Sequence, residues 1–261
     1  MRKPIKKIRT LKNISIAWLL PNLMTMAGFA TGLTGLRFGL NERWDIAVLM
    51  VALAGVIDAL DGRMARFLKS ASSFGAHLDS LSDLVVFGIV PALSLYLWAL
   101  QSSGRWAWAA CLFYTICIAL RLARFNSELQ DDTDSTKNYF SGIPAPAAAM
   151  LVLVPIVADL QFQLSLLYNP VFLSLWLVVV GIGAISIIPT FTGKELRIPR
   201  TFALPMMGAF ALVVVMLIVQ PWLTWLVLAG IYAACLPLSC WLYYKHNYAA
   251  SKSTKLDVSE E

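Results

Sequence analysis

The sequence is short of charged residues, histidine and cysteine, and each shortage argues against a class of protein. Charged residues make up 14% of the 261 residues, whereas an average soluble domain carries about 25%. Because 59% of the residues are hydrophobic, one aqueous core cannot enclose the apolar surface, and we expect no separate soluble domain. The chain has two histidines and four cysteines, with no C-x2-C spacing, which disfavours a zinc site or a disulfide framework.

The net charge of +6 could suggest a nucleic-acid-binding protein, but the distribution of the charge argues against it. The lysines and arginines lie at the ends of apolar segments rather than in a patch interleaved with exposed aromatic residues. We therefore expect no nucleic-acid partner. Membrane lipids with anionic headgroups, and substrates that carry phosphate, are the partners that this pattern favours.

Long apolar segments make up most of the chain. Most of them approach the roughly 20 residues that a helix needs to cross the hydrocarbon of a bilayer. The sequence therefore predicts an all-α fold, a polytopic membrane helical bundle of about eight transmembrane helices, with six as the alternative if the last pair is peripheral. The eight segments are 15–39, 45–67, 76–100, 105–126, 143–160, 169–189, 203–219 and 222–244.

Three regions and an orientation follow from this pattern. Residues 1–14 are basic with interspersed apolar residues and predict an amphipathic segment on the cytoplasmic membrane surface. Residues 15–244 form the membrane-embedded domain, and residues 245–261 are predicted to be a disordered cytoplasmic tail. With both termini in the cytoplasm, eighteen of the 21 lysines and arginines lie on that side, in keeping with the positive-inside rule.

Four carboxylates lie at the junction of the second and third apolar segments. Residues three and four apart share a helix face, so Asp58 and Asp61 face the same way on one helix, as do Asp79 and Asp83 on the next. The short polar turn between the two helices would make them antiparallel neighbours. The four acids would then converge at the cytoplasmic ends of both helices.

Carboxylates at contact distance repel one another, and a bound divalent cation removes that conflict. Oxygen ligands favour a hard ion such as Mg²⁺, Mn²⁺ or Ca²⁺ over zinc, and two ions sharing carboxylates would suit a phosphoryl-type displacement. Gly62 and Gly75 leave room for a backbone or a ligand, and Arg66 is suited to hold a phosphate oxygen. A structural polar cluster and an ion pathway are the alternatives.

The pattern D-x2-D-G-x2-A-R-x8-G-x3-D-x3-D runs from Asp58 to Asp83 with every fixed position present. It resembles the signature of the CDP-alcohol phosphotransferases. The resemblance implies that Asp58, Asp61 and Asp79 bind Mg²⁺ or Mn²⁺, two ions per site, and that Asp83 is the general base and a further ligand. It also implies CDP-diacylglycerol as the donor substrate. The positions expected near that donor are Asn22, Thr25, Gly62, Arg66, Ser72 and Gly75.

The segment Pro21-Asn22-Leu23-Met24-Thr25 is similar to a P-N-x-x-T feature of that family, near its cytidine site. Hydrogen bonding between helices is the alternative role for its two polar side chains.

A second stretch narrows the expected acceptor alcohol. R-L-A-R-F-N followed by Y-F-x-G-I-P-x-P-A-A-A, and later I-S-I-I-P-T-F-T-G-K, resemble the bacterial phosphatidylserine synthase group of the same family. This resemblance implies L-serine as the acceptor, release of CMP, and a bacterial-type inner membrane with the active site facing the cytoplasm. It also makes a homodimer plausible.

A serine carboxylate would need a cationic partner, and Arg121, Arg124 and Lys194 are the candidates, which the sequence does not rank. Snorkelling of the two arginines to lipid headgroups is the alternative. Glycerol 3-phosphate, inositol phosphate or choline as the acceptor, and a cation transporter in place of an enzyme, are the competing hypotheses.

Overall fold

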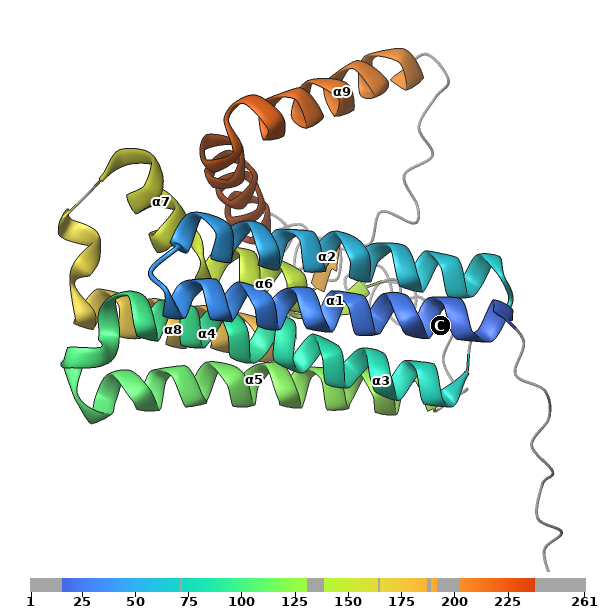
Figure 1. The fold of residues 1–261 in the computed structure, drawn as a ribbon, viewed down its shortest axis with the longest axis horizontal. Coiled ribbons are helices and arrows are strands. Elements are labelled where there is room, and N and C mark those ends of the chain that lie inside the picture. Colours follow the sequence, from blue (N-terminus) through green and yellow to red (C-terminus); the bar gives the residue numbers. More distant parts are fainter. Residues whose placement is uncertain are drawn as a thin grey trace, which may run out of the picture.

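The computed structural model describes residues 16–70, 72–130, 139–163, 165–186, 189–191 and 202–237. Most of these residues form a bundle of helices running along its long axis, and α9 stands apart on one side (Figure 1). The elements in chain order are α1 (Ile16–Leu40), α2 (Trp44–Phe67), α3 (Ser73–Asp83), η1 (Leu84–Ile89), α4 (Val90–Leu95), η2 (Tyr96–Leu100), η3 (Gln101–Ser103), α5 (Arg105–Gln130), β1 (Tyr139–Ser141), α6 (Ala145–Val152), α7 (Val154–Phe162), η4 (Ser165–Tyr168), α8 (Pro170–Ile185), β2 (Pro189–Phe191), α9 (Ala203–Val219) and a last helix, Pro221–Pro237.

The first helix is packed against its neighbours at glycines. A Cβ atom added at Gly32 would lie 2.8 Å from Val86 Cγ2, and one at Gly35 would lie 3.0 Å from the backbone oxygen of Ala47. Small residues of this kind let two membrane helices approach backbone to backbone. The contacts fix α1 against both α2 and the π-helical turn η1, and with it the positions of the polar side chains that α1 carries.

The third predicted segment is a single long helical stretch, Ser73–Ser103, but its geometry is irregular. The stretch changes from α3 to the π-helical turn η1 directly after Asp83, and Pro91 follows in the first turn of α4. Proline has no N–H to donate to the preceding turn, which accounts for an interrupted hydrogen-bond pattern before it. The wider turn therefore lies beside the last of the four acids.

The hydrophobic core lies where α4, α5, α6 and α8 meet. Its largest fully buried side chains come from η1, α4, α5 and α8 and from the junction of α6 with α7. They include Phe87, Leu95, Tyr114, Ile118, Leu153, Leu173 and Leu177. This core holds α5 against the long stretch Ser73–Ser103, so that the ends of α3 and α5 stay side by side.

The predicted segment 143–160 is a broken helix. It consists of α6 and α7, which meet at Leu153 with a bend of 40°. Pro155 in the first turn of α7 cannot donate a hydrogen bond to α6, which is a known cause of such a bend.

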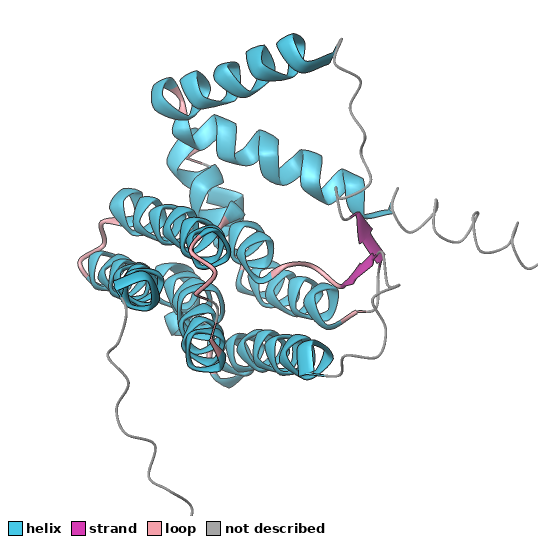
Figure 2. Cartoon of the chain, turned by 90° about the vertical axis from the view of Figure 1, so that its right-hand side faces the viewer, coloured by secondary structure: helices cyan, strands magenta, loops and turns pink. Residues whose placement is uncertain are grey.

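The predicted all-α fold is confirmed, and a short β-ladder of two three-residue strands is an addition to it. β1 and β2 pair antiparallel, with Tyr139 opposite Phe191 and Ser141 opposite Pro189, at one side of the bundle (Figure 2). Gly142 follows β1 with a φ of 84°, a backbone conformation that side-chain-bearing residues rarely adopt. The nearby Pro144 disfavours helix at the residue before it, which agrees with the non-helical backbone of Ile143 directly before α6.

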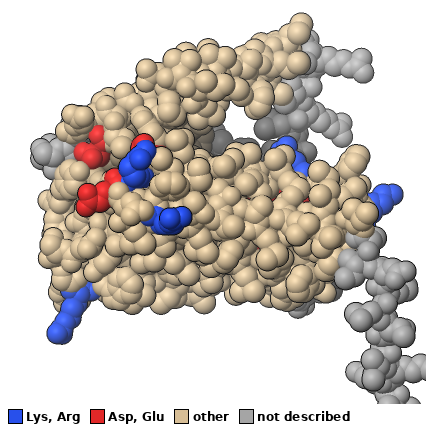
Figure 3. Space-filling view, in the orientation of Figure 1, with Lys and Arg blue, Asp and Glu red and all other residues tan. Residues whose placement is uncertain are grey.

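The apolar helices agree with the predicted membrane protein, but they do not confirm eight spans. Among the described residues, three helices are long and apolar enough to cross a membrane, namely Ile16–Leu40, Ser73–Ser103 and Arg105–Ser127, and the bent pair α6–α7 would make a fourth. The helices Pro170–Ile185, Leu204–Val219 and Pro221–Pro237 are apolar but shorter, and α2 carries the acids. On the face drawn in Figure 3, charged side chains gather toward the two ends and leave the middle uncharged.

The predicted terminal regions, 1–14 and 245–261, lie outside the described residues.

Candidate metal centre and substrate site

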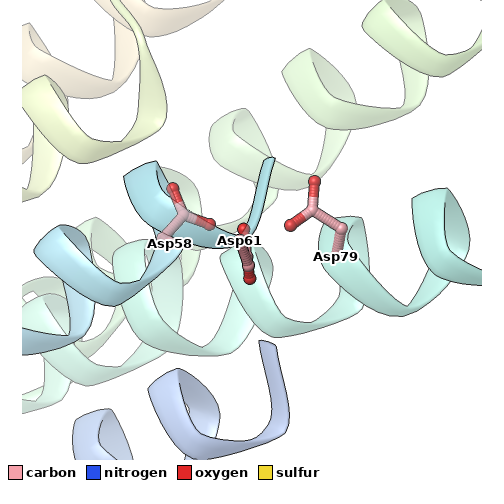
Figure 4. A group of neighbouring side chains, drawn as sticks. All are labelled: Asp58, Asp61 and Asp79. Atoms are coloured by element: carbon pink, nitrogen blue, oxygen red, sulfur yellow. The ribbon is translucent and has the colours of Figure 1, made fainter. Parts of the chain in front are cut away.

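Three aspartates meet between α2 and α3. Asp58 and Asp61 lie one turn apart near the end of α2, and Asp79 lies in the middle of α3. One carboxylate oxygen from each lies within 4.8 Å of one from each of the others. The three side chains point into the same space in Figure 4. The predicted convergence of the two helices is therefore confirmed for these three acids.

Asp83 adds a fourth carboxylate one turn further along. Its side chain lies next to that of Asp58. Neighbouring carboxylates repel one another unless they share a proton or a cation. The Oδ1 atom of Asp83 is buried and has no hydrogen-bond partner in the described structure. Asp83 thus lies next to the other three acids, and one of its carboxylate oxygens has no hydrogen-bond partner among the described residues.

Among the described residues, no cationic side chain forms an ion pair with this group. Within the described part of the chain, the one ion pair shorter than 4.0 Å joins Arg43 to Asp45, at 3.5 Å, near the opposite end of α2. Four acids offer only oxygen donors, and among the described residues one of these oxygens has no hydrogen-bond partner and none is ion-paired with a cation. This donor set fits a hard divalent ion. The residues present therefore suit Mg²⁺ or Mn²⁺.

The polar residues of α1 complete one side of the group. Thr25 is buried, and its hydroxyl donates a hydrogen bond of 2.7 Å to Oδ2 of Asp61. Asn22, one turn earlier, is also buried and donates from Nδ2 to the backbone oxygen of Trp18 at 3.0 Å. The threonine thus orients one of the acids, while the asparagine is held by its own helix.

The two glycines of the acidic signature differ in their surroundings. A Cβ atom at Gly62 would find nothing within 4 Å, whereas one at Gly75 would lie 3.0 Å from Oδ1 of Asn22. Gly62 therefore borders open space, as predicted for a ligand, but Gly75 serves close packing of α3 on α1. Arg66 is exposed and donates from Nε to the backbone oxygen of Gly62 at 3.1 Å.

The side chain of Ser72 holds the start of α3 in place. Its side chain caps α3 by accepting a hydrogen bond from the backbone N–H of Gly75 at 3.1 Å, and it accepts a second from Nε1 of Trp18 at 3.1 Å. An N-cap satisfies one of the free N–H groups at a helix start. Trp18 also packs its ring on Phe74, with centroids 5.7 Å apart, so this corner joins the starts of α1 and α3.

A small pocket opens beside the acids. Both polar and apolar residues line it. The lining residues are Thr25, Gly28, Ala54, Asp58, Asp61, Ser82, Asp83, Val86 and Phe87. Sequence reasoning missed the buried Ser82, although its place one residue before Asp83 was a signal.

The candidate acceptor residues have different environments. Arg124 donates from Nη1 to the backbone oxygen of Ile185, at 3.1 Å, and so ties α5 to the end of α8. Arg121 interacts electrostatically with Asp83, and its Nε atom is buried without a hydrogen-bond partner in the described structure. Lys194 lies outside the described residues.

Asn126, the last residue of the R-L-A-R-F-N stretch, has a role that sequence reasoning missed. It exchanges hydrogen bonds of 2.9 and 3.1 Å with Ser80. Ser80 follows Asp79 directly, so this pair holds α5 against the acidic segment of α3.

Comparison with known proteins gives a consistent result. Residues 18–182 match the family model described as CDP-alcohol phosphatidyltransferase. The chain is 35% identical over 223 residues to a protein of Mycobacterium leprae named CDP-diacylglycerol--serine O-phosphatidyltransferase, covering 85% of this chain and 74% of that one. Proteins of the same name from Mycobacterium tuberculosis and Bacillus subtilis are 34% and 33% identical, over 85% and 60% of this chain and 78% and 80% of theirs.

Proposed function

Because the chain belongs to the CDP-alcohol phosphatidyltransferase family, we propose that it transfers the phosphatidyl group of CDP-diacylglycerol to the hydroxyl of L-serine and releases CMP. The observation that carries this proposal is the group of four aspartates, which lies inside the matched residues. The relatives named above supply the serine assignment through their names.

Asp58, Asp61 and Asp79 would hold the divalent cation, and Asp83, which contacts Asp58, would complete a site for a second ion. When bound, such ions neutralise charge on the pyrophosphate of the donor and on the departing CMP. The chain's own part is to place the oxygen ligands, and Thr25 fixes one of them through its hydrogen bond to Asp61.

The donor would lie with its acyl chains in the bilayer and its pyrophosphate at the acids. Gly62 borders open space, so the nucleotide can approach the backbone of α2 there. The exposed Arg66 lies one turn away and would hold a phosphate oxygen. Asn22 and Thr25 would border the cytidine. Ser72 and Gly75 shape this end of the site through the cap of α3 rather than through open space.

Asp83 is the proposed general base. The serine Oγ forms a bond to the phosphorus that carries diacylglycerol, the bond from that phosphorus to the CMP oxygen breaks, and the hydroxyl proton passes to an Asp83 oxygen. A neutral serine hydroxyl is a poor nucleophile, so a positioned base is a reasonable requirement. The unpartnered Oδ1 of Asp83 is available for this proton.

The proposal includes a place in the membrane. Eight spans with both termini in the cytoplasm would put the acids at the inner surface of a bacterial-type inner membrane, where a soluble amino acid meets a lipid. The beginnings of α1 and α3 and the end of α2 lie at one end of the bundle (Figure 1), in agreement with that arrangement. A homodimer is part of the same proposal.

An acceptor panel tests the proposal. The purified protein is given CDP-diacylglycerol, Mg²⁺ or Mn²⁺, and one of L-serine, glycerol 3-phosphate, inositol phosphate or choline, and CMP release is measured. We expect CMP and phosphatidylserine with L-serine, and only with a divalent cation. CMP release with another alcohol and not with serine would reject the serine assignment, and no CMP with any acceptor would favour the cation-transporter alternative.

A further inference from the structure

The last helix, Pro221–Pro237, contributes a polar group to the interior of the bundle. One side of this helix packs on the hydrophobic core along the stripe Trp222, Trp225, Leu226, Ala229, Tyr232 and Leu236. Nε1 of Trp225 donates to the backbone oxygen of Met150 at 3.2 Å, which fixes the helix against α6. Tyr232 continues this stripe, so its side chain points inward.

The hydroxyl of Tyr232 is buried and has no hydrogen-bond partner in the described structure. Tyr114 offers a contrast, because its buried hydroxyl donates to the backbone oxygen of Phe87 at 2.8 Å. A buried tyrosine hydroxyl normally finds such a partner. The free hydroxyl of Tyr232 therefore requires an explanation that packing alone does not supply.

Arg121 of α5 is the cationic neighbour of this hydroxyl. Its guanidinium is close enough to interact electrostatically both with Tyr232 and with the Asp83 carboxylate. Its Nε atom is likewise buried without a hydrogen-bond partner, and in the described residues it makes no ion pair with Asp83. A guanidinium and a phenol hydroxyl are both donors and together suit a carboxylate.

We propose that Tyr232 and Arg121 together bind the carboxylate of the acceptor amino acid and so select L-serine. The inference rests on the proposed function, since it places the serine Oγ at Asp83 and the serine carboxylate at Arg121. Serine fits this span because only two carbon atoms separate its hydroxyl oxygen from its carboxylate carbon. A choline acceptor, being cationic, would be repelled by the same guanidinium.

The position of Tyr232 in the chain agrees with a role in acceptor choice. It lies outside residues 18–182, which match the family model, whereas the four acids and Arg121 lie inside them. The family description names alcohols in general, so residues that distinguish one alcohol from another are expected partly outside the shared stretch. Of the three cationic candidates, Arg121 is preferred, because Arg124 is bonded to α8.

The test compares the wild-type protein with Tyr232→Phe, Arg121→Gln and a matched control, Tyr168→Phe. Tyr168 donates to Oδ2 of Asp159 at 2.9 Å and is exposed, so its substitution removes the same atom away from the site. CMP release is measured against the concentration of L-serine and of serinol, in which a hydroxymethyl group replaces the carboxylate, at saturating CDP-diacylglycerol and Mn²⁺. The ratio of the kcat/KM values for the two acceptors does not depend on the folded fraction of a variant.

We expect Tyr232→Phe to raise the KM for L-serine by about tenfold, as for loss of one hydrogen bond to a charged group, with kcat and the serinol rate unchanged. Arg121→Gln should raise the serine KM at least as much, and Tyr168→Phe should change neither value. An unchanged serine-to-serinol ratio in Tyr232→Phe would overturn the inference and leave the proposed function standing. Failure of the wild-type protein to use serine would overturn both.

Discussion

The hydrogen bond from Thr25 to Asp61 leads to a prediction that tests metal binding separately from substrate binding. Replacing Thr25 with valine keeps the volume and β-branching of the side chain and removes only the hydroxyl, which donates to Oδ2 of Asp61 at 2.7 Å in a buried position. A hydrogen bond to a charged group contributes about 1.5–3 kcal/mol, which corresponds to roughly ten- to hundredfold in a binding constant. Residues that orient metal ligands have effects of about the same size.

The assay is CMP release from CDP-diacylglycerol and L-serine as a function of Mn²⁺ concentration. We expect Thr25→Val to need about ten- to hundredfold more Mn²⁺ for half-maximal activity, because Asp61 loses the contact that orients it. Thr25→Ser, which keeps the hydroxyl, should recover most of the loss.

Thr34→Val is the matched control on the same helix. The Thr34 hydroxyl is exposed and donates to the backbone oxygen of Ala30 at 2.7 Å, so its loss touches no acid. The reasoning is refuted if Thr25→Val and Thr34→Val give the same Mn²⁺ activation curve.

Three further predictions concern the acids and the glycines. Asp83→Asn should abolish CMP release while sparing most CDP-diacylglycerol binding, measured as ligand-induced thermal stabilisation; equal loss of both would make Asp83 mainly a metal ligand. EDTA should stop CMP release and lower the melting temperature at neutral pH, because four clustered carboxylates then repel one another, and an unchanged melting temperature would argue against a bound ion. Gly75→Ala should destabilise the protein by about 1–3 kcal/mol, since its Cβ would lie 3.0 Å from Asn22 Oδ1. Gly62→Ala has open space inside α2 and should stabilise the protein against unfolding in detergent by up to about 1 kcal/mol; equal stabilities would contradict the contrast.

The acidic group was predictable because its spacing is local. Residues three and four apart on a helix share a face whatever the tertiary structure, so the pairing of Asp58 with Asp61 needed only the sequence. The meeting of these two with Asp79 needed only the short turn between the helices, and the structure confirms it. The apolar segments 15–39 and 45–67 likewise correspond closely to α1 and α2.

The parts that were not predicted depend on contacts between distant segments. The role of Gly75 could not be distinguished from that of Gly62, because only the packing of α1 on α3 places Asn22 against one and not the other. The pairing of β1 with β2 joins residues about fifty positions apart, and no local sequence pattern predicts such a pairing. The proposed role of Tyr232 was not anticipated for the same reason, since one tyrosine in an apolar helix looks like a core residue.

The glycine contacts of α1 have a consequence for any mutational scan of this chain. A side chain forced in at Gly32 would meet Val86, whose Cγ2 atom lies 2.8 Å from the added Cβ, and we expect α1 to move away from η1 to relieve this contact. Thr25, two turns away, would travel with it and release Asp61. Inactivating substitutions along α1 are therefore expected to include positions where helices touch inside the bundle, away from the acids themselves.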